Sequence, residues 1–221
     1  GRDPECWWVE KEVDAIVVDE TIMAHQPARY LAAGSLDAIA KFVEVHHNRG
    51  AFTPTSVPVD VYAAYHSAAT TYELLNLFTE QACADVAEGK LTEAVHTVVF
   101  CNIALTGIIS SMTRGRGQAA LGHSFYNGLK TCFFDETHGY KHGELVGTGL
   151  LVQTAFDKND ELRSAVMSLL KKSNLPVTFA ELGITDKEKG VRKLADYMEN
   201  YDGIKDIPDG KKRLIAALKT L

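Results

Sequence analysis

The chain has 221 residues, 46% of them hydrophobic, which is enough apolar material for one large domain or two small ones with a packed core. The formal net charge is -6, and the basic residues are scattered singly or in short groups, so we expect neither a nucleic-acid partner nor a membrane. The N-terminus has neither a signal-peptide layout nor a lipidation motif, which predicts a cytoplasmic protein.

The first predicted element is a short β-branched run between two acids, Asp14-Ala-Ile-Val-Val-Asp19, which has the pattern of a strand. A single strand cannot satisfy its own backbone groups, so we expect it to be the last piece of a sheet that belongs to a missing domain. Residues 1–27 are therefore assigned to the remnant of an N-terminal domain, and residues 28–221 to a separate helical domain.

From residue 28 onward the apolar residues recur with helical spacing almost everywhere, and the interruptions predict seven or eight helices. The interruptions are rich in glycine, proline and polar residues, and they lie at residues 48–58, 88–90, 113–117, 137–140, 157–160, 173–176 and 201–209. The fold class predicted is thus mainly α, a multi-helix domain with one residual strand.

The predicted helices differ in how deeply they should be buried. Residues 145–156 carry no formal charge and must be surrounded by other elements, whereas residues 158–172, 186–201 and 209–221 mix charged and apolar positions as outer helices do. Residues 94–112 are also uncharged, but several polar side chains interrupt them, which favours a buried central helix over a membrane span.

The cysteines are far apart in the sequence, without the Cys-x-x-Cys spacing of a redox or zinc motif: Cys6, Cys83, Cys101 and Cys132. Three of them lie within apolar helical patterns. We therefore expect reduced thiols, with no disulfide and no metal role.

The first candidate for chemistry is Asp37, whose helical neighbours one turn away are the small residues Ala33, Gly34 and Ala40. A carboxylate on a small, apolar helix face is costly to bury unless a cation or several donors compensate it. The alternatives are that Asp37 caps a neighbouring helix or pairs with Lys41.

Two histidines are further candidates. His123 follows the small residues Ala119 and Ala120 on an apolar helix, although an isolated histidine there is commonly just a core residue. His142 opens the uncharged helix, where the positive end of the helix dipole favours the neutral, metal-ligating imidazole. Beside it Gly143 leaves room, and Glu144 is either a hydrogen-bond acceptor for a ligand or a helix-start acid.

His138 lies four residues before His142, in a segment whose glycine favours a turn, so it is a ligand, a proton carrier or a surface residue. Two neutral imidazoles and one carboxylate with a fourth position open are typical of a catalytic metal site, because structural zinc prefers four protein ligands. Such a set indicates Lewis-acid chemistry on a substrate oxygen.

Together these segments resemble the helical domain of the glycerol dehydrogenase branch of the iron-containing alcohol dehydrogenase superfamily. The likeness covers residues 14–42, 122–129 and 137–153 and fades after about residue 157. The family's ligands are an aspartate in a Gly-x-x-Asp-Ala segment, a histidine four residues before Asn-Gly, and the histidine of a His-Gly-Glu motif. The resemblance thus implies that Asp37, His123 and His142 bind a divalent metal, either zinc or iron, and that His138 takes part in catalysis as a proton-relay residue.

The departures from the family pattern narrow the assignment. Other iron-containing alcohol dehydrogenases have a second histidine one turn after the aspartate, and this chain has Lys41 there, so the three-ligand, often zinc-using branch fits better. Dehydroquinate synthase and its cyclase relatives share the architecture but use glutamate as the first ligand. Glycerol-1-phosphate dehydrogenases also use one aspartate and two histidines, and they stay open.

The family's N-terminal nucleotide-binding domain, with its glycine-rich loop, has no counterpart here. Gly147-Thr-Gly149 lies inside the apolar helix and is better explained by close helix packing. The resemblance implies the catalytic half of an NAD- or NADP-dependent polyol dehydrogenase, which oxidises a secondary alcohol by hydride transfer and is inactive without its cofactor domain. A homo-oligomer is left open.

Two rival functions are carried forward. One is a phosphorylated-polyol dehydrogenase or a cyclase relative, in which Arg114 and Arg116, just before the His123 helix, would bind an anionic substrate group. The other is a non-catalytic helical module that keeps the fold without metal or cofactor.

Overall fold

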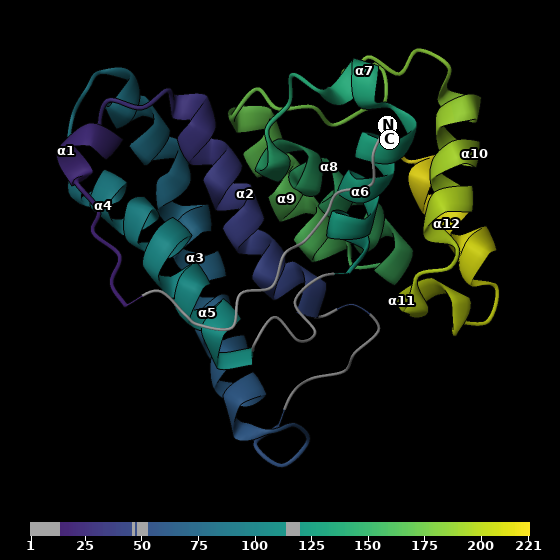
Figure 1. Ribbon diagram of the computed structural model, residues 1–221, viewed down its shortest axis with the longest axis horizontal. Helices are drawn as coiled ribbons and strands as arrows, with labels where there is room; N and C mark the ends of the chain where they lie inside the picture. The colour runs from purple at the N-terminus through teal and green to yellow at the C-terminus, as the bar shows by residue number, and fades with distance from the viewer. Residues whose placement is uncertain (1–13, 46, 48–52, 114–119) are drawn as a thin grey trace.

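The computed structural model describes residues 14–45, 47, 53–113 and 120–221, and the only regular secondary structure in these ranges is helical (Figure 1). Three very short helices are α1 (Glu20–Met23), α7 (Phe134–Thr137) and α11 (Asp202–Lys205). The longer ones are α2 (Ala28–Val45), α3 (Val59–Ala87), α6 (Leu121–Cys132), α8 (His142–Asp157), α9 (Asp160–Lys172), α10 (Lys187–Met198) and α12 (Gly210–Leu218). The mainly helical fold predicted from residue 28 onward is confirmed.

One further long helix is built from three consecutive segments: α4 (Glu93–Phe100), the π-helical turn η1 (Cys101–Leu105) and α5 (Thr106–Thr113). It is apolar and long enough to cross a membrane by length and composition, a test that the packed helices of other proteins also pass. Only 28% of its most apolar window is buried, and Phe100 and Ile108 are about half exposed. The prediction of a buried central helix here is wrong, because α2 and α3 cover only part of its surface.

The predicted strand does not form. Asp14 lies in a bend and residues 15–19 have no regular secondary structure, while Ile16 and Val17 are 60% and 94% exposed. A β-branched run becomes a strand only when another strand takes up its backbone hydrogen bonds. Every regular element in the described residues is a helix, so no such partner strand is available there.

The central helix is α8, as its uncharged sequence predicts. All of its residues from Gly143 to Thr154 are buried, and it packs against α2, α6, α9 and α12. Its glycines allow this: a Cβ on Gly147 would lie 2.9 Å from the Leu36 side chain, and one on Gly149 would lie 2.5 Å from the Gly122 carbonyl oxygen. The pair is thus a packing feature, as expected.

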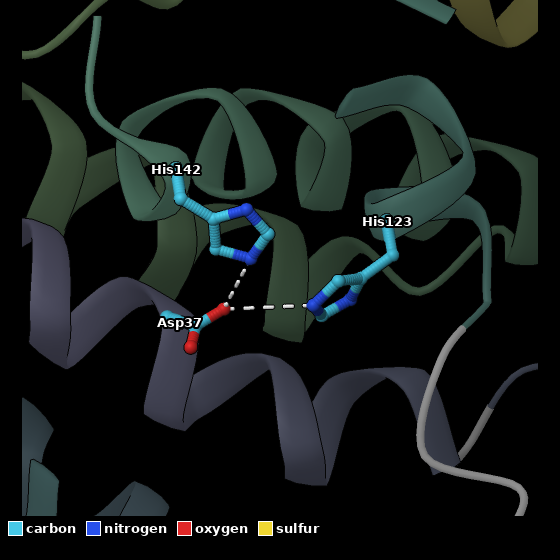
Figure 2. A group of neighbouring side chains, drawn as sticks. All are labelled: Asp37, His123 and His142. Atoms are coloured by element: carbon cyan, nitrogen blue, oxygen red, sulfur yellow. Dashed lines mark ion pairs between the residues drawn. The ribbon is translucent and has the colours of Figure 1, made fainter. Parts of the chain in front are cut away.

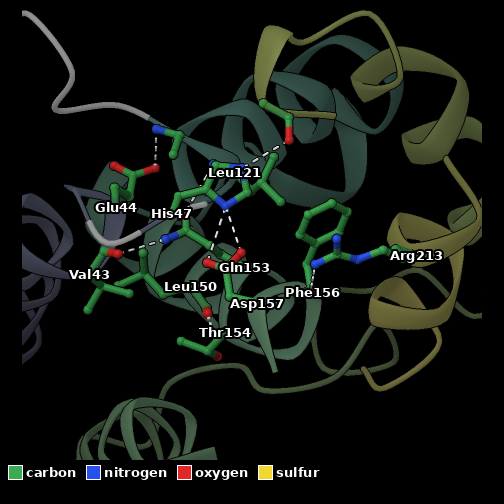
Figure 3. A network of polar contacts seen from close by, with 12 residues as sticks. Val43, Glu44, His47, Leu121, Leu150, Gln153, Thr154, Phe156, Asp157 and Arg213 are labelled. Carbon is green, nitrogen blue, oxygen red and sulfur yellow. Dashed lines mark hydrogen bonds and ion pairs between the residues drawn. The ribbon is translucent and has the colours of Figure 1, made fainter. Parts of the chain in front are cut away.

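Helix α2 is the second organising element, running through the middle of the molecule between α3 and α8 (Figure 1). Helices α1, α3, α4 and α5 lie on one side of it, and the elements from α6 to α12 lie on the other. Polar bonds tie α2 to the second group, because the Gln153 amide on α8 donates to the Val43 carbonyl and accepts from the Leu121 N–H (Figure 3).

The far end of α8 is held in the same way. Asp157 lies 2.9 Å from Nδ1 of buried His47, whose Nε2 lies 3.2 Å from the Gly203 carbonyl oxygen (Figure 3). Arg213 donates to the Phe156 carbonyl and stacks its guanidinium over that ring at 4.3 Å. These contacts connect the C-terminal end of α8 to the segment after α2, to α11 and to α12.

Among the described cysteines, Cys83, Cys101 and Cys132, there is no disulfide, and Cys6 lies outside the described residues. Burial raises the pKa of the Cys83 thiol to about 11, so this sulfur is a poor metal ligand and a poor nucleophile at neutral pH.

Candidate metal centre

Three side chains from three helices converge on one point (Figure 2). Asp37 lies on α2, His123 on α6 and His142 at the first residue of α8. The Asp37 Oδ1 atom is 3.1 Å from Nε2 of His142 and 3.5 Å from Nε2 of His123, and the three atoms all lie within 4.8 Å of one another. The two rings are 5.3 Å apart between centroids.

Small residues make this convergence sterically feasible. A Cβ on Gly143 would lie 1.9 Å from the Ala33 carbonyl oxygen, so α8 begins in backbone contact with α2 one turn before Asp37. The close approach of Gly149 to Gly122 brings α6 against α8 in the same manner. Larger side chains at these positions would push the three helices, and hence the three candidate ligands, apart.

The geometry at Asp37 is compatible with a metal ligand. Its Oδ1 is buried and makes no hydrogen bond of acceptable geometry, although two imidazole nitrogens face it. Ligand atoms arranged as a tetrahedron at about 2 Å from a zinc ion are about 3.3 Å apart, close to the two measured separations. The side chain does not pair with Lys41 in the described contacts.

The electrostatics of the cluster are strongly coupled. Burial alone would raise the pKa of Asp37, but the two imidazoles that face it, those of His123 and His142, outweigh burial and hold that pKa well below its usual range. For His123 the direction is opposite: burial alone would lower its pKa, but the charge of Glu44 and the interactions with Asp37 and Glu44 raise that pKa to about 9. Two carboxylates, those of Asp37 and Glu44, thus face the imidazoles of this cluster.

Glu44 is the site residue that sequence reasoning missed. Its carboxylate is fully buried and accepts the backbone N–H of Ala120 at 2.8 Å and of His123 at 2.9 Å, together with the His123 ring Nδ1. It therefore caps α6 from another helix, because Ala120 at the N-cap has no side-chain acceptor. An acid in the apolar run Phe42-Val-Glu-Val45, two turns after Asp37, was the available signal.

Glu144 proves to be a helix-start acid. Its buried carboxylate accepts the Lys141 N–H at 2.8 Å and is paired with Arg29 of α2. This contact fixes the first turn of α8, where His142 lies, against α2, where Asp37 lies. The His142 side chain remains 45% exposed, so the centre opens to the surface.

The remaining candidates are not part of the cluster in the described residues. His138 follows α7, is exposed, and has Nδ1 within 2.8 Å of the Asp135 carbonyl oxygen, while its ring stacks on Phe134. It is not among the three convergent ligands. Arg114 and Arg116 lie outside the described residues.

Comparison with known proteins gives several relatives that are named glycerol dehydrogenase. The chain is 36% identical over 188 residues to a glycerol dehydrogenase from Pseudomonas putida, covering 81% of this chain and 49% of that protein. It is 31% identical over 186 residues to a glycerol dehydrogenase from Thermotoga maritima, covering 83% and 50%. No family model matches the chain.

The fold comparison agrees. The structure of a probable glycerol dehydrogenase from Sinorhizobium meliloti superimposes with a TM-score of 0.81 at 24% identity, covering 98% of this chain and 61% of that one. The chain thus spans about half the length of the curated relatives that it matches. By these similarities the chain belongs to the glycerol dehydrogenase-like branch of the iron-containing alcohol dehydrogenase superfamily, a group of oxidoreductases.

Proposed function

We propose that this chain is the metal-binding catalytic half of an NAD(P)-dependent polyol dehydrogenase that oxidises a secondary alcohol of a glycerol-like substrate. The observation that carries the proposal is the convergence of Asp37, His123 and His142 with the buried Asp37 Oδ1 left without a hydrogen bond. The glycerol dehydrogenase names of the relatives support the substrate class.

Asp37, His123 and His142 would hold a divalent metal, with zinc favoured by the three-ligand set and iron as the alternative. When bound there, the metal supplies the Lewis acidity that lowers the pKa of a substrate hydroxyl. Asp37 contributes the negative charge, and the two imidazoles contribute neutral nitrogen ligands. The exposure of His142 leaves an approach for a small polyol from solvent.

The nicotinamide cofactor would be bound by the other half of the enzyme. Residues 1–27 would be the edge of that nucleotide-binding domain, and residues 28–221 the catalytic one. On this proposal the chain alone neither binds NAD or NADP tightly nor oxidises polyols, and it works in the cytoplasm of the cell.

His138 is proposed as a proton-relay residue. It lies four residues before His142 and is exposed, so its ring can exchange protons with solvent. Its loss should lower activity of a full-length enzyme without lowering metal content.

The test is a zinc titration of the metal-free chain, followed by calorimetry, for wild type, Asp37→Asn and a matched control, Asp157→Asn. Both variants change a carboxylate that faces a histidine, but only Asp37 belongs to the cluster. We expect one zinc per chain for wild type and for the control, and at least a 100-fold weaker affinity for Asp37→Asn.

Failure of the wild-type chain to bind zinc or ferrous iron would refute the metal site and favour the non-catalytic helical module. Tight binding of NAD or NADP to the isolated chain would refute the division of labour between two halves.

A further inference from the structure

We infer that Glu44 is a positioning residue for the metal centre: it fixes His123 in the tautomer that carries its proton on Nδ1 and leaves the Nε2 lone pair free for the metal. This inference rests on the proposed metal site. It adds to that site a residue that lies outside the three ligand motifs.

The first step is that Glu44 has no freedom to turn. Its side chain is fully buried, and its Oε1 accepts two backbone N–H groups, those of Ala120 at 2.8 Å and His123 at 2.9 Å. Its other oxygen, Oε2, therefore points at Nδ1 of the His123 ring. Gly122 keeps this space open, because a Cβ there would lie 3.1 Å from Glu44 Oε1.

The second step concerns the ring. A neutral imidazole has one N–H and one lone pair, and an ionised carboxylate can only accept a hydrogen bond. The nitrogen that faces Glu44, Nδ1, must therefore hold the proton. The lone pair is left on Nε2, which points at Asp37 Oδ1 from 3.5 Å and belongs to the convergent cluster.

The same backbone donors make the substitution Glu44→Gln informative. The amide oxygen of glutamine must take the place of Oε1, since the Ala120 and His123 N–H groups would oppose an NH₂ group there. The NH₂ group then points at Nδ1 of His123, which has to accept. The proton moves to Nε2, and the metal loses its lone pair.

The predicted effect is a zinc affinity about 10- to 100-fold weaker in Glu44→Gln than in wild type, the range typical for loss of a carboxylate that orients a ligating histidine. Affinity should be measured by chelator competition at pH 10, above the pKa of His123, where proton competition at that ring is small in both proteins, with Asp157→Asn as control. That variant places an amide beside a histidine, His47, that lies outside the metal centre. The control should bind zinc within threefold of wild type.

The direct readout is the ¹⁵N signature of the His123 ring in the metal-free protein at pH 10, above its pKa of about 9. We expect the Nδ1–H tautomer in wild type and the Nε2–H tautomer in Glu44→Gln. A loss of packing alone would lower stability without exchanging the two nitrogen signals, so the spectrum separates positioning from a merely structural role.

The Nε2–H tautomer in wild type, or unchanged zinc affinity in a folded Glu44→Gln protein, overturns the inference. The wild-type spectrum decides even where the variant does not fold. Because that spectrum needs no metal, a wild-type chain that shows the Nδ1–H tautomer and binds no zinc would refute the proposed function while leaving the tautomer assignment of His123 intact.

Discussion

Metal affinity should depend on pH through His123 more steeply, and at higher pH, than for an ordinary histidine. In the metal-free protein two carboxylates, Glu44 and Asp37, face this ring and raise its pKa to about 9. A metal ion must displace the proton on Nε2. Protons therefore compete with metal throughout the neutral range.

The magnitude follows from that pKa. At pH 7 about 1 chain in 100 has a neutral His123, and at pH 9 about half do, so the apparent affinity should rise about 50-fold between these values and less than twofold beyond them. The rise corresponds to about 2.3 kcal/mol of binding free energy. Asp37 adds nothing here, because its lowered pKa keeps it ionised over the whole range.

The assay is zinc competition against a chromophoric chelator at constant ionic strength, with correction for the chelator's own protonation. Asp157→Asn should follow the wild-type curve. An affinity that levels off by pH 7.5, or that changes less than fivefold from pH 7 to pH 9, would show that His123 carries no extra proton and would refute the electrostatic argument.

Helix packing, metal content and the pH dependence of stability can each be tested as well. Gly149→Ala should lower the free energy of unfolding in urea by about 1–3 kcal/mol or more, because its Cβ would lie 2.5 Å from the Gly122 carbonyl oxygen. The control Gly107→Ala, with open space around it, should be neutral or stabilising. Equal effects of the two substitutions would contradict the packing argument. His142→Ala should remove bound metal in elemental analysis and His138→Ala should not, so equal losses would mean that the wrong histidine was chosen. The free energy of unfolding of the metal-free chain should decrease by up to about 3 kcal/mol as pH rises from 6.5 through 9. The reason is that the stabilisation from the raised pKa of His123 is complete below pH 6.5 and is lost above pH 9. Denaturation midpoints that stay constant or increase over this range would contradict the prediction.

The local sequence was sufficient for the helices and for the choice of the three candidate ligands. Apolar spacing predicted seven or eight helices, and the absence of charge from residue 145 to 156 predicted the buried α8. These properties depend on neighbours within a few turns, so they can be read without knowledge of the fold. The three ligand motifs could likewise be recognised one by one, because each is a short local pattern around Asp37, His123 or His142.

The tertiary structure decided everything that depends on partners far away in the chain. Glu44 reaches Ala120 and the His123 ring across more than seventy residues, and its role appears only when α2 and α6 are side by side. The apolar run at residues 15–18 has strand composition but no partner to complete its hydrogen bonds, and the apolar helix at residues 93–113 has composition typical of a core but only partial cover. The composition of a segment determines how favourable its burial would be. Only the packing of distant segments determines whether another element is present to bury it or to complete its hydrogen bonds.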